Sequence, residues 1–230
     1  ESVPVGGEWT SGGKPPPGYP KDSSQCDDDV NSSALPAYND VMLELVLRAP
    51  SNAQSFSFDS LFLTYEYPDY LCSAFNDFFV VLVDPPPDGL EDDDTPPPAR
   101  DEFPGRNVLF DAQGDPVGVN SGLLSVCRQA ERGRAQRPVE CTLGPALLAD
   151  TGFDQGESTC AAQQTDERDI GGASTGWLHT SVPVPAGKLI TIRILLWDNG
   201  DPLLDSTVVI DNFQWSPMQL PLGTGPISSG

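Results

Sequence analysis

Prolines and glycines interrupt this chain so often that long helices have little room in it. The sequence holds 24 prolines and 22 glycines, and proline inside a helix removes a backbone donor and breaks it. The apolar runs between these residues are short and rich in β-branched or aromatic side chains, as is typical of strands. The sequence therefore predicts an all-β fold, a β-sandwich resembling a jelly roll, with long proline-rich loops.

The apolar runs give the positions of the expected strands. Val41–Leu47 alternates apolar residues on one face, and Phe78–Val83 is apolar on both faces, as in a central strand. Ser55–Tyr67 places three phenylalanines on one face and two leucines with a tyrosine on the other. The other predicted strands are Asn107–Phe110 and Val117–Val119, which form a predicted hairpin, followed by Leu189–Trp197 and Thr207–Trp215.

The strand pattern predicts one folded domain with two extended ends. We assign residues 38–216 to the β-sandwich domain. Residues 1–37 and 217–230 are rich in glycine, proline and serine, and we expect an extended N-terminal segment and an extended C-terminal tail. Inside the domain, residues 84–104 (DPPPDGLEDDDTPPPARDEFP) form an acidic, proline-rich insertion. Such a stretch cannot form a core strand, so it is predicted to be a surface loop.

Acidic residues outnumber basic ones almost threefold. The chain has 34 acidic residues against 12 lysines and arginines, for a net charge of -22. That charge argues against nucleic acid and anionic membrane surfaces as partners. No apolar stretch has the length of a membrane span, so we expect no membrane insertion. Because the chain begins with Glu1, we expect a processed form of the protein.

Five cysteines favour disulfides over a zinc site. None lies in a CxxC pair, and the chain has one histidine. Cys127 and Cys141 flank a polar stretch and form the first expected pair; Cys26 with Cys72 is the second, which leaves Cys160 over. The spacing alone does not fix this connectivity. Disulfides indicate an oxidising compartment, so we expect a secreted protein at the cell surface or outside the cell.

Acidic residues on two segments form a candidate calcium site. Alternation in 207–215 places Asp211 on one face with apolar neighbours, and Glu66 falls on the phenylalanine face of its strand. An inward carboxylate needs a hydrogen-bonding partner or a metal, and calcium prefers oxygen ligands. The alternative is that these acids cap turns and accept hydrogen bonds from amides and hydroxyls. The candidate ligands are Glu66, Asp77, Asp198, Asp201, Asp205 and Asp211.

Two blocks of the sequence resemble the choice-of-anchor L domain of bacterial surface proteins. YEYPDYLCSAFNDFF is similar to its S-E-E-Y-P-E-Y-V-x-S-x-F-N-D-x-F signature, and DNGDPLLDSTVVIDN is similar to its DGD…DSxVxIDN ending. The resemblance covers roughly Asn39 to Trp215 and is closest to cysteine-containing versions typical of myxobacteria-like organisms. Tyr65 departs from the usual serine or glutamate. The resemblance implies an exported protein of the bacterial surface and no known reaction.

Enzyme motifs are weak in this sequence. Gly172–Gly176 matches the G-x-S-x-G nucleophile elbow, but that motif needs a hydrophobic strand before it and a helix after it, and neither flank fits. His179 follows too closely to serve as a positioned base. Glycoside hydrolysis needs a pair of carboxylates, and no pair stands out among so many acids. The sequence therefore predicts a protein that is not an enzyme.

We expect an extracellular structural protein that self-associates, as a fibre subunit does, with calcium-stabilised loops. Copies of the chain are the expected partners, because an extended segment can add a strand to a neighbour's sheet edge. The alternative is a carbohydrate-binding or adhesive module that contacts surface glycans. Its candidate aromatic residues are Trp9, Tyr19 and Trp177, for which ordinary packing is the competing interpretation.

Overall fold

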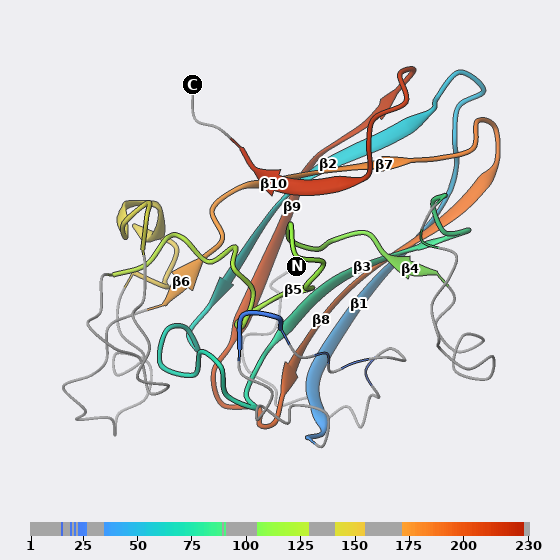
Figure 1. The fold of residues 1–230 in the computed structure, drawn as a ribbon. Coiled ribbons are helices and arrows are strands. Elements are labelled where there is room, and N and C mark those ends of the chain that lie inside the picture. Colours follow the sequence, from blue (N-terminus) through green and yellow to red (C-terminus); the bar gives the residue numbers. More distant parts are fainter. Residues whose placement is uncertain are drawn as a thin grey trace, which may run out of the picture.

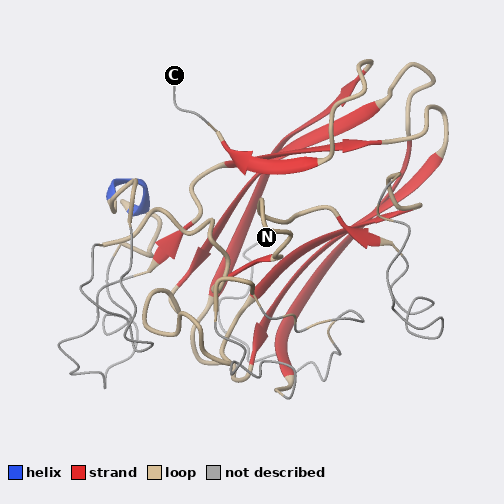
Figure 2. Cartoon of the chain, viewed as in Figure 1, coloured by secondary structure: helices blue, strands red, loops and turns tan. Residues whose placement is uncertain are grey.

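The apolar runs of the sequence become strands of two antiparallel sheets in a computed structural model of the protein. It describes residues 15, 19, 21, 23–26, 35–88, 90, 105–128, 141–154 and 172–227. Within these ranges the fold is all-β, as predicted, and the helical content is a short 3-10 turn, η2 (Ala146–Leu148). Figures 1 and 2 show the long strands arranged in two layers, as in a sandwich.

The first sheet, sheet A, is built around β8. Its strand order is β1-β8-β3-β4, and β5 also pairs with β3. Leu45 of β1 and Val83 of β3 lie on either side of Ile192, so β8 is a central strand and β1 is an edge strand. The bounds are β1 (Ala37–Arg48), β3 (Phe78–Asp84), β4 (Arg106–Asn107), β5 (Val117–Gly118) and β8 (Leu189–Asn199).

The second sheet, sheet B, is built around β2. Its order is β10-β7-β2-β6, and β9 pairs with β2 along the edge opposite β7. The polar residue Thr64 ends β2, where the longer apolar run was predicted to continue to Tyr67. The bounds are β2 (Ser55–Thr64), β6 (Ala173–Ser174), β7 (Leu178–Pro183), β9 (Ser206–Ser216) and β10 (Gly223–Pro226).

The core lies between the two sheets. Phe56 and Phe62 of β2 share one buried cluster with Phe79 of β3, which confirms the phenylalanine face predicted for β2. The opposite face carries Leu61 and Tyr65, which pack on a smaller cluster beneath the loop containing η2. Each large apolar side chain buried in this way contributes roughly 1.5–3 kcal/mol relative to an exposed one. Alternation along β2 therefore separates two apolar layers.

The hairpin predicted for 107–110 and 117–119 is present only as its turn. The Asp111 N–H donates to the Asp115 carbonyl at 2.9 Å, and Phe110 forms a bridge with Pro116. The flanking strands β4 and β5 pair with β3 and not with each other. Strand β3 needs partners for its backbone groups on the side away from β8, and the two short strands supply them.

The sandwich extends beyond residue 216, where we placed its boundary. β10 lies in the segment predicted to be an extended tail and pairs with β7. Ser55 fixes the connection, because its hydroxyl donates to the Met218 carbonyl at 3.0 Å and accepts the Leu220 N–H at 2.7 Å. The sequence GTGP of β10 has no apolar alternation, so no pattern marked it as a strand.

Disulfides join the two cysteine pairs that the sequence favoured. Cys26–Cys72 ties residues 23–26 to the loop after β2, and Cys127–Cys141 closes a separation of 14 residues. Ser24 supports the first connection through its hydroxyl, which donates to Asp115 at 2.6 Å. Two disulfides indicate a non-cytoplasmic environment. No helix in the described part of the chain has the length and apolarity to cross a membrane.

Several sequence-based predictions fall outside the described residues. They concern Trp9, Cys160, most of the segment 1–37 and most of the insertion 84–104. The described part of that insertion comprises residues 84–88 and 90 and begins at the last residue of β3.

Candidate functional site

Three buried carboxyl groups meet where β2, β3, β8 and β9 end or begin. Glu66 follows β2, Asp77 precedes β3, and Asp198 lies near the end of β8; 3%, 0% and 6% of their surfaces are exposed. We call these three residues the carboxyl cluster. The sequence predicted that two inward acids, Glu66 and Asp211, converge with the loop after β8. Glu66 meets Asp77 and Asp198 here, but Asp211 is exposed and does not join them. Asp201 and Asp205 add negative charge beside Asp198.

Backbone amides and a hydroxyl hold the two deepest carboxyl groups. Asp77 Oδ1 accepts the Asn199 N–H at 3.3 Å, and Oδ2 accepts the Ser206 hydroxyl at 2.5 Å. Glu66 Oε2 accepts the Asp77 N–H at 3.3 Å. The cluster therefore links the loop after β2 to the starts of β3 and β9 and to the end of β8. Hydrogen bonds of this kind are what a buried carboxyl group requires.

Burial makes these three carboxyl groups weaker acids than exposed aspartate or glutamate side chains. Desolvation raises the pKa of Glu66 to about 8, although hydrogen bonds with Asp77 lower it. Desolvation, followed by the charge of Glu66, raises the pKa of Asp77 well above its ordinary value. Desolvation also raises the pKa of Asp198 to about 6, against the effect of a 2.8 Å hydrogen bond from the Asn39 amide. Glu66 and Asp77 therefore share at least one proton near neutral pH.

The cluster offers oxygen ligands but not a formed metal site. Among the described residues, no group of three or more His, Cys, Asp or Glu side chains is placed to hold a metal ion. The Asp201 carboxylate accepts the Leu203 N–H at 2.9 Å and so caps its own turn, as the alternative interpretation expected. Asp205 is exposed, and its carbonyl accepts the Tyr65 N–H at 3.4 Å.

Asp211 lies on the outward face of β9, which corrects the inward orientation predicted from alternation. Ile210 packs against the core, whereas Asp211 is exposed. The register with β2 shifts at the next residue, Asn212, whose φ is 53°. A bulge of this kind inserts one residue and moves the following side chains to the opposite face. Phe213 consequently stacks on the buried ring of Phe56, and strict alternation fails at Asp211.

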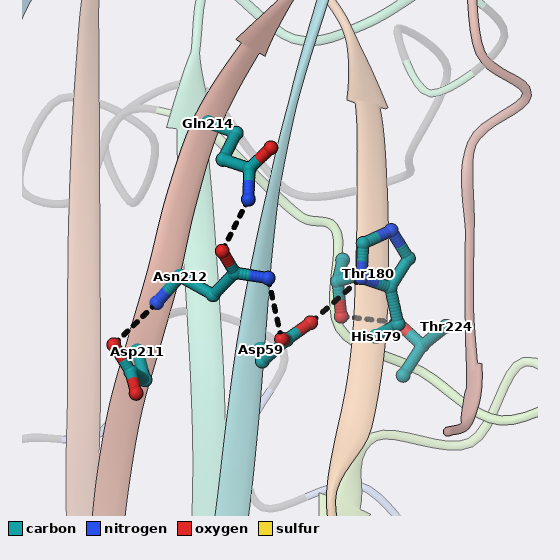
Figure 3. Close-up of polar contacts among 7 residues, drawn as sticks. All are labelled: Asp59, His179, Thr180, Asp211, Asn212, Gln214 and Thr224. Carbon is teal, nitrogen blue, oxygen red and sulfur yellow. Dashed lines mark hydrogen bonds and ion pairs between the residues drawn. The ribbon is translucent and has the colours of Figure 1, made fainter. Parts of the chain in front are cut away.

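The outward side chains of sheet B form a polar row (Figure 3). Asp59 Oδ1 lies 2.7 Å from His179 Nδ1, and Oδ2 accepts the Asn212 side-chain amide at 2.8 Å. The Asn212 backbone N–H donates to Asp211 at 2.6 Å, and the Gln214 amide donates to the Asn212 side chain. We call Asp59, His179, Asn212 and Gln214 the polar row. Sequence reasoning missed it, because only the pairing of β2 with β7 and β9 brings these residues together.

The G-x-S-x-G match is a short strand. Ala173–Ser174 is β6 and pairs with the end of β2. Ser174 is buried, and its hydroxyl accepts the Gly176 N–H at 3.0 Å. The serine is therefore placed to support a turn.

β1 exposes apolar side chains on both of its faces. Val41 and Leu43 lie on the core-facing side of sheet A and are 65% and 52% exposed, while Met42 and Val46 lie on the other side and are 51% and 55% exposed. One edge of β1 pairs with β8, and no strand of the described residues pairs with the other edge. A long, apolar edge strand is a template for pairing with another chain.

Few features of β1 oppose such pairing. Glu44 forms an ion pair with Arg193 of β8, with 2.8 Å between Oε2 and Nε. Arg48 donates to the Gly187 carbonyl at 3.1 Å. A bulge between Tyr38 and Val41 interrupts the register at the start of the strand. Charges and bulges blunt edge strands, but the stretch from Val41 to Leu47 has one charged residue.

Two of the candidate sugar-contacting aromatics are described. Tyr19 packs edge-on against Phe78 and Trp197, with ring centroids 5.6 and 5.5 Å away. It covers the outer face of sheet A, so packing and not an open aromatic platform explains it. Trp177 is 38% exposed and precedes β7.

No family model, curated protein or solved structure matches this chain. The resemblance to the choice-of-anchor L domain therefore stays a prediction, carried by two blocks of sequence. Those two blocks meet in the carboxyl cluster, because Glu66 and Asp77 come from the first, and Asp198 with Ser206 comes from the second. The residues that carry the resemblance thus build one corner of the sandwich.

Proposed function

We propose that this protein is a non-enzymatic structural protein of the bacterial surface that assembles outside the cell through its edge strands. The exposed apolar edge of β1 is the observation that carries the proposal. Two disulfides agree with an oxidising compartment. The two blocks that resemble a family of exported surface proteins support the bacterial surface as its location.

Strand addition at β1 is physically favourable because it uses the backbone. A second strand satisfies the outward N–H and C=O groups without requiring special side chains. It also covers Val41, Met42, Leu43 and Val46, each of which is more than half exposed. Full burial of one apolar side chain contributes roughly 1.5–3 kcal/mol, and the contact buries about half of each of these four side chains. The contact therefore contributes on the order of 3–6 kcal/mol before the entropic cost of association.

A second edge lets such an assembly continue. β9 pairs with β2 on one side only within the described residues, and it exposes Val209 and Phe213 by 40% and 39%. A chain with one edge on each sheet can contact two neighbours. A chain that contacts one neighbour through each of two separate edges extends into a fibre when the arrangement does not close into a ring, so we propose β9 as the second contact of a fibre subunit.

We propose calcium as the ion that stabilises the loop after β8 and lowers repulsion between copies. Each copy carries a net charge of -22, which opposes association at low ionic strength. Asp198, Asp201 and Asp205 place three carboxylates around one loop. A ligand that binds only the folded state must raise its stability. An unchanged melting temperature on chelation would therefore refute the calcium proposal.

Sedimentation velocity and electron microscopy test the assembly proposal. Wild-type protein is compared with Leu43→Lys, which places a charge on the β1 edge, and with Met218→Lys, a matched control at a 65% exposed apolar residue outside β1. We expect oligomers or fibres from the wild type and the control, and nothing larger than a dimer from Leu43→Lys, because that variant keeps only the β9 contact. A strictly monomeric wild type at high concentration, with and without calcium, would refute the proposal.

A second candidate function is a carbohydrate-binding or adhesive module. The exposed Trp177 lies two residues before His179, and the polar row presents amides and a carboxylate on an open sheet face. Aromatic rings and planar polar groups are the chemistry that sugars require. A glycan array probed with wild type and Trp177→Ala tests it. Binding by the wild type that Trp177→Ala abolishes supports this function, and no binding above background rejects it.

A further inference from the structure

We propose that β1 pairs antiparallel with β1 of a second copy, with Glu44 of each copy facing the other at a twofold axis. The inference rests on the proposed function and deepens it, because it names the partner strand and the register. Its product is one continuous sheet formed by sheet A of both copies. The paired stretch of β1 is Val41–Arg48, which pairs with β8 without interruption.

The faces of β1 limit the possible registers. Met42 lies opposite Leu195, which belongs to the cluster on the outer face of sheet A, and Leu43 lies opposite Ile194, which packs on the core. A twofold axis perpendicular to the sheet keeps the outer faces of both copies on the same side. Even-numbered residues of β1 must then face even-numbered residues of the second copy, and odd must face odd.

Apolar matching selects one register among these. With Glu44 on the axis, Met42 faces Val46 of the second copy, Leu43 faces Leu45, and Val41 faces Leu47. All the exposed apolar residues of the strand then have apolar partners. With Leu43 on the axis, Glu44 faces Met42, and with Leu45 on the axis, Glu44 faces Val46. Both registers place a charge opposite an apolar side chain and break the match between apolar residues.

The length of the regular stretch excludes the remaining registers. Val41–Arg48 pair with β8 without interruption, whereas the register shifts between Tyr38 and Val41. With Met42 on the axis, Val46 falls opposite Tyr38, beyond that shift. With Val46 on the axis, Glu44 faces Arg48, but Val41 and Met42 lie beyond the paired stretch and stay exposed.

One like-charge contact remains at the centre of this register, between the two copies of Glu44. Each Glu44 carboxylate already lies 2.8 Å from the Arg193 guanidinium of its own copy. The outer face therefore presents a row of four charges: Arg193, Glu44, then Glu44 and Arg193 of the second copy. Two positive charges flank the two negative ones, which offsets their repulsion.

A cysteine scan along β1 locates the axis. Met42→Cys, Glu44→Cys and Val46→Cys are made one at a time in a Cys160→Ser background and treated with a short bismaleimide. A crosslinker of roughly 8 Å reaches the self-paired residue, about 5 Å from its copy, but not residues four positions along, about 14 Å away. We expect several-fold more covalent dimer from Glu44→Cys than from the other two variants.

A double variant keeps the test valid if replacing Glu44 weakens the dimer. Met42→Cys with Val46→Cys sets a cysteine opposite a cysteine and leaves Glu44 in place. We expect it to cross-link as efficiently as Glu44→Cys, and several-fold more than either single variant.

Sedimentation of the same samples separates failure of the register from failure of the proposed function. Self-associated protein with its cross-linking maximum at Met42→Cys or Val46→Cys, or with equal yields from all variants, overturns the register and leaves self-association intact. Wild-type protein that sediments as a monomer and forms no cross-linked variant overturns the proposed function itself.

Discussion

β1 and β3 flank the same strand, β8, yet their burial is opposite. Val80 and Val81 of β3 are fully buried, so β3 is covered on both faces. Met42 and Leu43 of β1 are each about half exposed, so β1 is open on both faces. Both strands read as apolar runs in the sequence. An apolar run therefore identifies a strand, but it does not say whether the rest of the chain covers that strand.

The difference follows from the neighbours of each strand. β3 has β8 along one edge and β4 and β5 along the other (Figure 1). Its two faces contact two separate clusters, the core and the outer cluster that includes Tyr19. β1 has β8 alone within the described residues. We infer that β1 obtains in the assembly the contacts that β3 obtains within the chain.

The largest expected effect is the loss of a core side chain on β3. Phe79→Ala removes a fully buried ring and should reduce the free energy of unfolding by about 3–5 kcal/mol. Leu43→Ala on β1 should reduce it by less than about 1 kcal/mol in dilute, monomeric protein, because the side chain is already half exposed. Urea denaturation measures both. Equal losses would remove the distinction between the strands.

Removing a disulfide should weaken the fold without affecting β1. Replacing Cys127 and Cys141 with serine opens a loop of 14 residues, which costs about 3 kcal/mol in the chain-entropy model. The association of folded protein should stay unchanged, because these cysteines lie in the core cluster and not on the β1 edge. Urea denaturation measures the loss of stability, and sedimentation measures the association. A folded variant that no longer associates would contradict the prediction that the disulfide and the β1 edge act independently.

The carboxyl cluster should make the protein less stable as pH rises. The pKa of Glu66 is about 8 in the folded state and about 4.3 when unfolded, so between these values the folded state binds more protons. Its contribution is full below about pH 4 and is lost as pH rises through 8. Asp198, with a folded pKa of about 6, loses its contribution at lower pH. Melting temperatures across this range measure the slope.

Glu66→Gln should flatten this slope, because an amide does not titrate. Glu44→Gln, which changes an exposed carboxylate outside the carboxyl cluster, is the matched control and should keep the slope. Bound calcium would reverse the sign, since metal ligands must be deprotonated. Stability that rises with pH in the presence of calcium but falls with pH after chelation would support calcium binding. A slope unchanged in Glu66→Gln would refute the role of the cluster.

The smallest expected effect is the loss of the Glu44–Arg193 ion pair. The Glu44 side chain is 44% exposed, and ion pairs at such positions contribute about 0.2–1 kcal/mol. Glu44→Gln should therefore change the monomer's unfolding free energy by at most about 1 kcal/mol. The measurement is urea denaturation at low protein concentration. A much larger loss would mean that β1 depends on its own chain more than its exposure indicates.

Alternation predicted the parts of the fold in which a strand runs without interruption. It assigned both faces of β2 correctly, and it identified Glu66 as a buried acid. It failed at Asp211, because the bulge at Asn212 leaves no mark in the apolar pattern. It also missed β10, which is held by backbone pairing with β7 and has no alternating apolar side chains.

The candidate sites were predictable to different degrees. The two sequence blocks indicated that Glu66 is inward and meets the loop that begins at Asp198, but they also placed Asp211 there, which is exposed. The polar row was not predictable, since Asp59 and His179 are 120 residues apart and meet only through strand pairing. The exposure of β1 was also unpredictable, because it depends on which strand ends the sheet.

Hydrogen–deuterium exchange at two protein concentrations tests most directly whether another copy covers β1. Outward amides of an open edge strand exchange rapidly, whereas those of a strand paired on both sides are protected. We expect the outward amides of Val41–Arg48 to become protected as concentration rises, while the amides of Phe78–Asp84 are protected throughout. Outward amides of Val41–Arg48 that still exchange fast at concentrations where the protein self-associates would contradict the account.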